Sequence, residues 1–85
     1  MEELITEIRE DFQIPPYYDD NSIHRLIIEG EAYFNRLNSN NDYQKDVVYR
    51  MLLKNYVYYA YHHKVSEYVE NYASTILTWQ MESEV

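Results

Sequence analysis

The most informative stretch of the chain is Val47 to Tyr61, where apolar and aromatic residues recur on almost every side of a predicted helix. At about 100° per residue, its apolar positions fall on three neighbouring faces: Val47, Met51 and Tyr58; Val48, Leu52, Tyr56 and Tyr59; and Tyr49, Leu53, Val57 and Ala60. A helix that is apolar nearly all round must be covered nearly all round. Because so short a chain can cover only part of this helix, we expect a second chain to cover the rest. The pattern therefore predicts an obligate assembly.

The stretch before it predicts two more helices. The first spans residues 2–12, with apolar side chains four positions apart, and must stop before Pro15 and Pro16, since proline cannot continue the hydrogen bonding. Residues 13–20 are interpreted as a rigid corner, with a recognition segment as the alternative.

The second helix is predicted over residues 21–37, with Asp20 or Asn21 as its N-cap. It contains Gly30, the only glycine in the chain. A glycine inside a helix costs about 1 kcal/mol relative to alanine. Either Gly30 permits close approach of another helix, or it is a neutral accident.

The third and fourth helices are predicted over residues 43–63, capped by Asp42, and 66–80, capped by Ser66. No glycine or proline separates them, so one continuous helix is the alternative. The fold class is therefore all-α. We expect a single domain over residues 1–85, a four-helix subunit with a long central helix that assembles into a ring.

Composition favours assembly as the source of stability. Domains of about this size are marginal alone and are often stabilised by disulfides, metals or oligomerisation. The 85 residues include no cysteine, which excludes disulfides and thiolate metal sites. No apolar run approaches the roughly 20 residues that span a bilayer, and the acidic amino terminus is unlike a signal peptide. We expect no membrane association and an origin in the cytoplasm.

The net charge of −8 is unevenly distributed. Residues 1–20 balance to −6, 21–41 to zero, 42–64 to +2 and 65–85 to −4. Such a chain repels nucleic acid. The uneven distribution indicates either ordinary solvated faces or attraction between the ends and the middle, within or between subunits.

Tyrosine is the outlier in composition, with 11 residues against two phenylalanines and one tryptophan. Tyrosine combines a large apolar ring with a polar tip, which suits surfaces buried against a partner. Eleven hydroxyl groups would be hard to satisfy in one small core, so partner surfaces are favoured.

Catalytic and ligand-binding patterns are absent from the sequence. The histidines are His24, His62 and His63, and neighbouring residues on a helix point about 100° apart, so the adjacent pair is poorly placed for one metal. No glycine-rich phosphate loop or nucleophile elbow occurs. We therefore expect no enzyme activity, no metal and no cofactor.

The order of these helices resembles the small head–tail connector, or adaptor, proteins of tailed bacteriophages. The most specific matches are two helix-packing patterns: Asp19-Asp20, Ile23 and Leu26-Ile27 in the second helix, and Tyr72, Ile76-Leu77 and Gln80 in the fourth. Two departures are Gly30, where alanine or serine is expected, and the short tail after Gln80, which bears on the portal-contacting end.

The resemblance implies a virion protein at the head–tail interface, made in the host bacterial cytoplasm. About a dozen copies would form a ring beneath the portal protein after DNA packaging. The ring would extend the DNA channel and seat a stopper or tail-completion protein. An acidic channel wall would let DNA slide without sequence-specific binding, because phosphates find no counter-charges there.

Within that expectation, aromatic residues are the candidate contacts. The candidate subunit interface is Tyr49, Tyr56 and Tyr59. The candidate portal contact is Tyr68, Tyr72 and Trp79. Glutamate at Tyr56 or Tyr59 is then expected to leave the subunit folded and to block assembly.

Two other functions remain open. An acidic inhibitor that mimics DNA and binds a host nucleic-acid-binding protein would share the charge of −8, but should display its carboxylates in regular rows. A regulatory or scaffolding helical module is the third interpretation.

Overall fold

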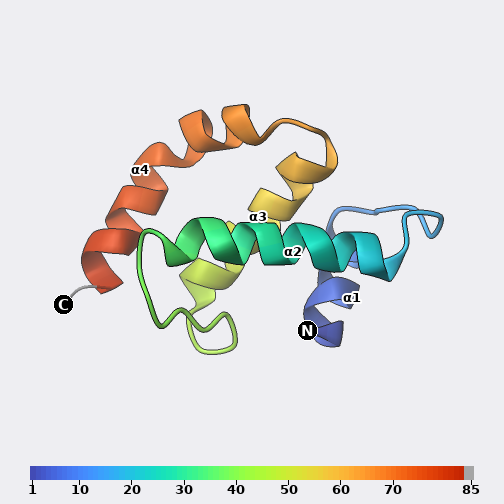
Figure 1. Cartoon of the computed structure of the whole chain (residues 1–85), viewed down its shortest axis with the longest axis horizontal. Coiled ribbons are helices and arrows are strands. Elements are labelled where there is room, and N and C mark those ends of the chain that lie inside the picture. Colours follow the sequence, from blue (N-terminus) through green and yellow to red (C-terminus); the bar gives the residue numbers. More distant parts are fainter. Residues whose placement is uncertain (84–85) are drawn as a thin grey trace.

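The computed structural model describes residues 1–83 as helices joined by loops, without a strand in that range; residues 84–85 lie outside the described part. The helices are α1 (Glu2–Asp11), α2 (Asp20–Asn35), α3 (Val47–Tyr61) and α4 (Val65–Ser83) (Figure 1). The all-helical fold predicted from the sequence is thereby confirmed.

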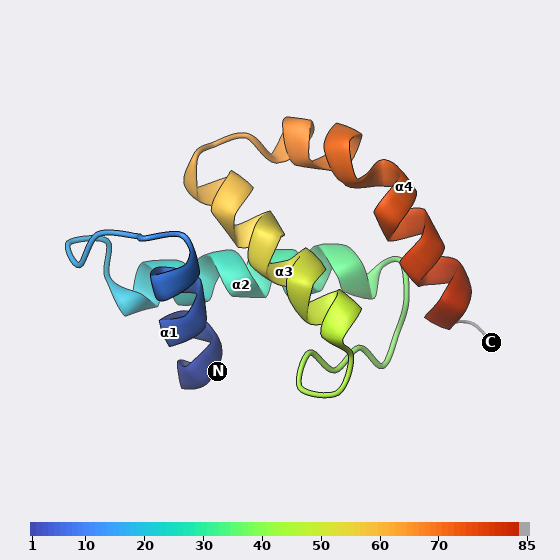
Figure 2. The same cartoon turned by 180° about the vertical axis from the view of Figure 1, so that it is seen from behind.

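α3 is the helix on which the others assemble, because it contacts α1, α2 and α4. α2 and α3 cross at the middle, α1 lies against both at one end, and α4 arches over from the end of α3 (Figures 1 and 2). The molecule is elongated, with principal extents of 41 × 26 × 19 Å. At 15 residues, α3 is shorter than predicted, and α4 with 19 is longer.

Aromatic rings join α4 to the core between α2 and α3. Trp79 of α4 stacks on Tyr49 of α3 with ring centroids 5.6 Å apart and meets the edge of Phe34 of α2 at 5.5 Å. Tyr56 and Tyr68 meet edge to face at 5.5 Å. Such pairs add about 0.5–1.5 kcal/mol beyond the burial of their area. Aromatic side chains therefore link α4 to both central helices.

Three of the predicted helix starts are wrong. α4 begins at Val65, so Ser66, its predicted cap, lies inside the helix. α2 is capped by Asp19, whose carboxylate accepts from the Ser22 backbone N–H at 2.8 Å. α3 begins at Val47, four residues later than predicted, and is capped by Asp46, which accepts from the Tyr49 N–H at 3.0 Å. The predicted cap, Asp42, accepts from the Gln44 N–H at 2.9 Å and closes a separate turn. Both aspartates are good N-caps, and the sequence alone did not decide between them.

α3 and α4 are separate helices, which settles the alternative left open by the sequence. His63 adopts a left-handed φ of 58°, and the Lys64 N–H donates to the Tyr59 carbonyl at 2.8 Å. α1 ends in the same way, with Gln13 at φ 52° and the Ile14 N–H donating to the Arg9 carbonyl at 3.0 Å. This pattern is the Schellman motif, which usually uses glycine at the left-handed position.

The loop after α1 is held by one side chain. The Arg9 guanidinium donates to the carbonyl oxygens of Pro15 and Tyr18, each at 2.9 Å, and pairs with Asp20 at 2.7 Å. Three contacts along one short loop fix its path. The geometry agrees with the interpretation of residues 13–20 as a rigid corner.

Candidate functional site

One side of α3 remains uncovered. Seen from behind, α3 crosses in front of α2 and no helix crosses in front of α3 (Figure 2). Val47, Val48 and Met51 at the start of α3 are exposed, with exposed fractions of 79%, 42% and 40%; we call them the α3 face. Val47 and Met51 belong to the first of the three apolar faces predicted for this helix. Exposed apolar side chains that gather on one face mark a candidate contact with another molecule.

A second apolar surface runs along α4. Val69, Ala73, Leu77 and Met81 are exposed and spaced by four residues, so they follow one side of the helix. Leu77 and Met81 expose 56% and 61% of their surface. We call these four residues the α4 stripe.

A shallow depression of about 340 Å³ separates α4 from the start of α3. It is lined by Val48 and Trp79 and by Ser74, Thr75, Thr78 and Glu82 of α4. Short hydroxyl side chains on one wall leave space beside the α3 face. The depression therefore extends the α3 face toward α4.

The predicted subunit interface needs correction. Tyr49 and Tyr56 expose only 1% and 7% of their surface and pack inside the chain's own core. They cannot form an exposed surface for a neighbouring subunit in this fold, because α2 and α4 cover them. Tyr59 is partly exposed, so its contact with a neighbour stays a prediction.

The predicted portal contact needs the same correction at two positions. Tyr68 and Trp79 are buried, and they face the core of the chain. Tyr72 is partly exposed and stacks on Tyr68 with ring centroids 4.7 Å apart. The helical period placed these residues on one face correctly, but that face packs inward.

Burial of the tyrosines is possible because their hydroxyl groups are satisfied or reach solvent. The Tyr68 hydroxyl donates to the Leu52 carbonyl at 2.7 Å. Burial raises the pKa of Tyr68 and of Tyr49 above the ordinary value, so both stay neutral. Among the described residues, the buried side-chain polar atom without a partner belongs to Asn38, not to a tyrosine. The core holds three of the eleven tyrosines, Tyr49, Tyr56 and Tyr68, so it does not have to satisfy eleven hydroxyl groups, and that expectation stays a prediction.

A cluster of four charges joins α1 to α3. The Glu7 carboxylate accepts from Arg50 and from Lys54, the latter at 2.5 Å, and Lys54 also pairs with Asp11 at 2.6 Å. Hydrogen bonds from Arg50 and Lys54 lower the pKa of Glu7 to about 2. The attraction between the acidic end and the basic middle thus occurs within the chain. Both pairs, Glu7 with Asp11 and Arg50 with Lys54, are spaced by four residues, a signal the sequence did contain.

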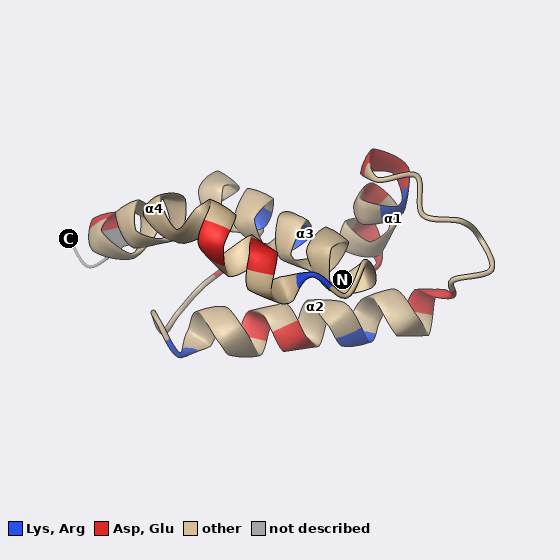
Figure 3. Ribbon diagram, turned by 90° about the horizontal axis from the view of Figure 1, so that it is seen from above, with Lys and Arg blue, Asp and Glu red and all other residues tan. Residues whose placement is uncertain are grey.

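The charges that remain are mostly acidic and lie on the outside. In the described part of α4, the charged residues are Glu67, Glu70 and Glu82, and none is basic (Figure 3). Lys45, two residues before the α3 face, is exposed and makes none of the salt bridges among the described residues.

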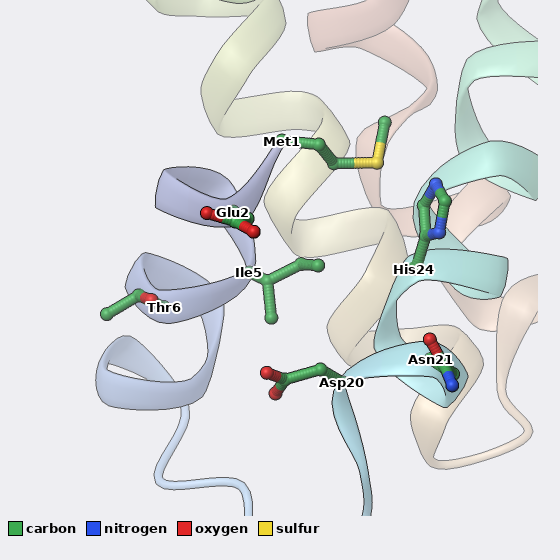
Figure 4. A pocket seen from close by; sticks show the side chains of 7 residues that line it. All are labelled: Met1, Glu2, Ile5, Thr6, Asp20, Asn21 and His24. Atoms are coloured by element: carbon green, nitrogen blue, oxygen red, sulfur yellow. The ribbon is translucent and has the colours of Figure 1, made fainter.

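The depression beside His24 offers no catalytic arrangement of side chains. It has about 450 Å³ and lies between α1 and the start of α2, lined by Met1, Glu2, Ile5, Thr6, Asp20, Asn21 and His24 (Figure 4). The Thr6 side chain points away from His24 (Figure 4), so the two do not form a nucleophile and base. No hydrogen bond joins two of these side chains in the part of the chain that is described.

The described residues form neither a metal-binding cluster nor a membrane-spanning helix. Within residues 1–83, no group of three or more histidine, cysteine, aspartate or glutamate side chains is placed to hold a metal ion. None of the helices described is both long and apolar enough to cross a membrane. No protein-family model, curated protein or solved structure matches the chain.

Proposed function

We propose that the chain is a subunit of an adaptor ring that docks on the portal of a tailed bacteriophage after DNA packaging. The ring extends the DNA channel and seats the next stopper or tail-completion protein. The observation that carries this proposal is the α3 face, three aliphatic side chains exposed at the middle of a small acidic chain. An exposed apolar face on the helix that organises the fold is best explained by a partner that covers it.

Two further features support the same function. The chain has four helices, in the order by which the sequence resembles phage connector proteins. The outward charge is acidic on α1 and α4, which suits a wall past which DNA moves without binding. Neither feature identifies a catalytic or ligand-binding role.

The geometry supports the DNA-mimic alternative less well. A mimic needs rows of free carboxylates, whereas Glu7 and Asp11 are paired with Arg50 and Lys54. The α3 face would also be left exposed on a monomeric mimic.

Portal binding tests the proposal directly. The purified chain is mixed with purified portal protein from the same genome and the mixture is separated by size and imaged by negative stain. We expect the chain to comigrate with the portal and to add a ring of density beneath it. The variant Ile28→Glu adds a negative charge at an exposed α2 position outside both apolar surfaces. It should bind the portal like the wild type. A chain that never comigrates with the portal contradicts the proposal, and inhibition of a nuclease by that chain would favour the mimic.

A further inference from the structure

The two apolar surfaces of the molecule point in different directions. On α4, Thr75 lines the depression beside the α3 face, whereas Leu77 of the α4 stripe is two residues further and about 200° around the helix. The α4 stripe therefore does not continue the α3 face of the same molecule. Two unlike patches that face different ways are what a head-to-tail contact between identical copies requires.

The charges beside these surfaces decide which pairing is favourable. Glu70 lies three residues before Ala73 on the side of the α4 stripe, and the described part of α4 has no basic residue. Stripe-to-stripe pairing of two copies would offer Glu70 no counter-charge. Beside the α3 face, Lys45 is exposed, the Asp46 carboxylate accepts from the Tyr49 and Trp79 N–H groups, and Glu82 lines the depression next to Val48. Opposite charges at a contact are favourable, so the charges favour the stripe against the face with Glu70 at the Lys45 end.

The α4 stripe is longer than the α3 face. The stripe runs from residue 69 to residue 81, about 18 Å at 1.5 Å per residue. The α3 face runs from Val47 to Met51, about 6 Å by the same rise, so only part of the stripe lies on it.

We infer that the α4 stripe of one copy docks on the α3 face of the next copy, with Glu70 approaching Lys45. The contact is heterologous, so each copy offers one surface to each of two neighbours. This inference rests on the proposed ring and names the residues that build it. In this contact, exposed aliphatic side chains join the subunits, and not the tyrosines that the sequence predicted and that the structure buries.

Two variants with opposite defects test this contact. Met51→Glu damages the α3 face and keeps the α4 stripe, whereas Leu77→Glu does the reverse; Ile28→Glu is the matched control. Each is analysed by native mass spectrometry, alone and mixed in equal amounts. We expect wild type and control to assemble, and each test variant alone to associate at least about tenfold more weakly, as for an interface hot spot. The mixture should give a one-to-one heterodimer and nothing larger, since only one intact pair of surfaces remains.

Several results overturn the inference. They are assembly of either test variant alone at wild-type strength, absence of the heterodimer from the mixture, and a wild type that stays monomeric at every concentration. Fluorescence of Trp79, which is buried, checks that each variant is folded. If a glutamate variant unfolds, Met51→Ser and Leu77→Ser replace it in the same design. A wild type that is monomeric but binds the portal overturns this contact and leaves portal docking standing. A wild type that assembles but does not bind the portal overturns the proposed function and leaves this contact standing.

A charge exchange tests the position of Glu70. Lys45→Glu alone and Glu70→Lys alone should each weaken assembly, because each places like charges at the contact. Mixed in equal amounts, the two variants should recover assembly, since every contact between unlike copies again joins opposite charges. The recovery should decrease as salt is added. Failure of the mixture to exceed either variant alone contradicts the assignment of this pair.

Discussion

Gly30 is a residue at which α2 rests directly on the side chains of α3. A Cβ atom added there would lie 2.7 Å from Cδ1 of Leu53 and 3.0 Å from Cδ1 of Tyr56, both of which are buried. Contacts this short require the neighbours to move, and a close-packed core resists such movement. The absent side chain therefore permits the approach of the two helices, which was one of the two interpretations of Gly30.

We expect Gly30→Val to destabilise the fold by about 2 kcal/mol or more, because overpacking exceeds the gain in helix propensity. The control is Ala32→Val, at an exposed position of α2, which should cost less than about 1 kcal/mol. Urea unfolding followed by Trp79 fluorescence measures both. Equal stabilities for the two variants would show that the site has room for a side chain.

Asp46 is a second residue whose side chain links two helices. One carboxylate oxygen caps α3 through the Tyr49 N–H at 3.0 Å, and the other accepts from the indole N–H of Trp79 at 3.1 Å. The residue thus joins the start of α3 to the end of α4.

Asp46→Ala should cost about 2 kcal/mol, the sum of a lost cap and a lost hydrogen bond. Asp42→Ala, which removes only the cap of the preceding turn, should cost less than about 1 kcal/mol. Thermal unfolding of the two variants side by side gives the comparison. The result that contradicts this role is a cost for Asp42→Ala as large as that for Asp46→Ala.

At the scale of the elements, α1 is held on α3 by charge as well as by apolar contact. Glu7 has a pKa of about 2 in the folded chain against an ordinary 4.5, because Arg50 and Lys54 stabilise its charged form. A lowered pKa contributes stability that is complete above about pH 4.5 and is lost as the pH falls toward 2.

Glu7→Gln should therefore destabilise the chain at pH 7 by about 1–2 kcal/mol, a value reduced for partial exposure of the pair. The difference from wild type should shrink between pH 5 and pH 3 in urea unfolding at each pH. Glu10→Gln is the matched control on α1, since Glu10 makes no salt bridge among the described residues. A pH-independent difference, or equal effects of the two variants, would refute the role of Glu7.

The sequence predicted the presence of each helix, but it predicted the helix ends and the inward faces less well. The two prolines predicted the loop after α1, and the spacing of apolar residues predicted where each helix lies. The break after α3 had no such signal, because His63 takes a left-handed conformation that usually favours glycine. The inward side of α3 could not be predicted from a helix that is apolar nearly all round, and the choice of its tyrosines as the exposed side was wrong at Tyr49 and Tyr56.

At the scale of the whole molecule, folding and assembly use different side chains. Tyr56 belongs to the core, whereas Met51 lies on the uncovered side of the same helix. Tyr56→Glu should abolish the helical circular-dichroism signal, because it buries an unpaired charge. Met51→Glu should leave that signal unchanged. A folded Tyr56→Glu variant would return this residue to the surface, as the sequence first suggested.

Sedimentation velocity of the wild-type chain over a wide concentration range, with and without the portal, tests the central claim most directly. The claim is that another copy covers the apolar surface that this fold leaves exposed. It predicts a sedimentation coefficient that rises with concentration toward that of a closed ring, and a ring retained on the portal. A chain that sediments as a monomer at every concentration would contradict it, even if that monomer binds the portal.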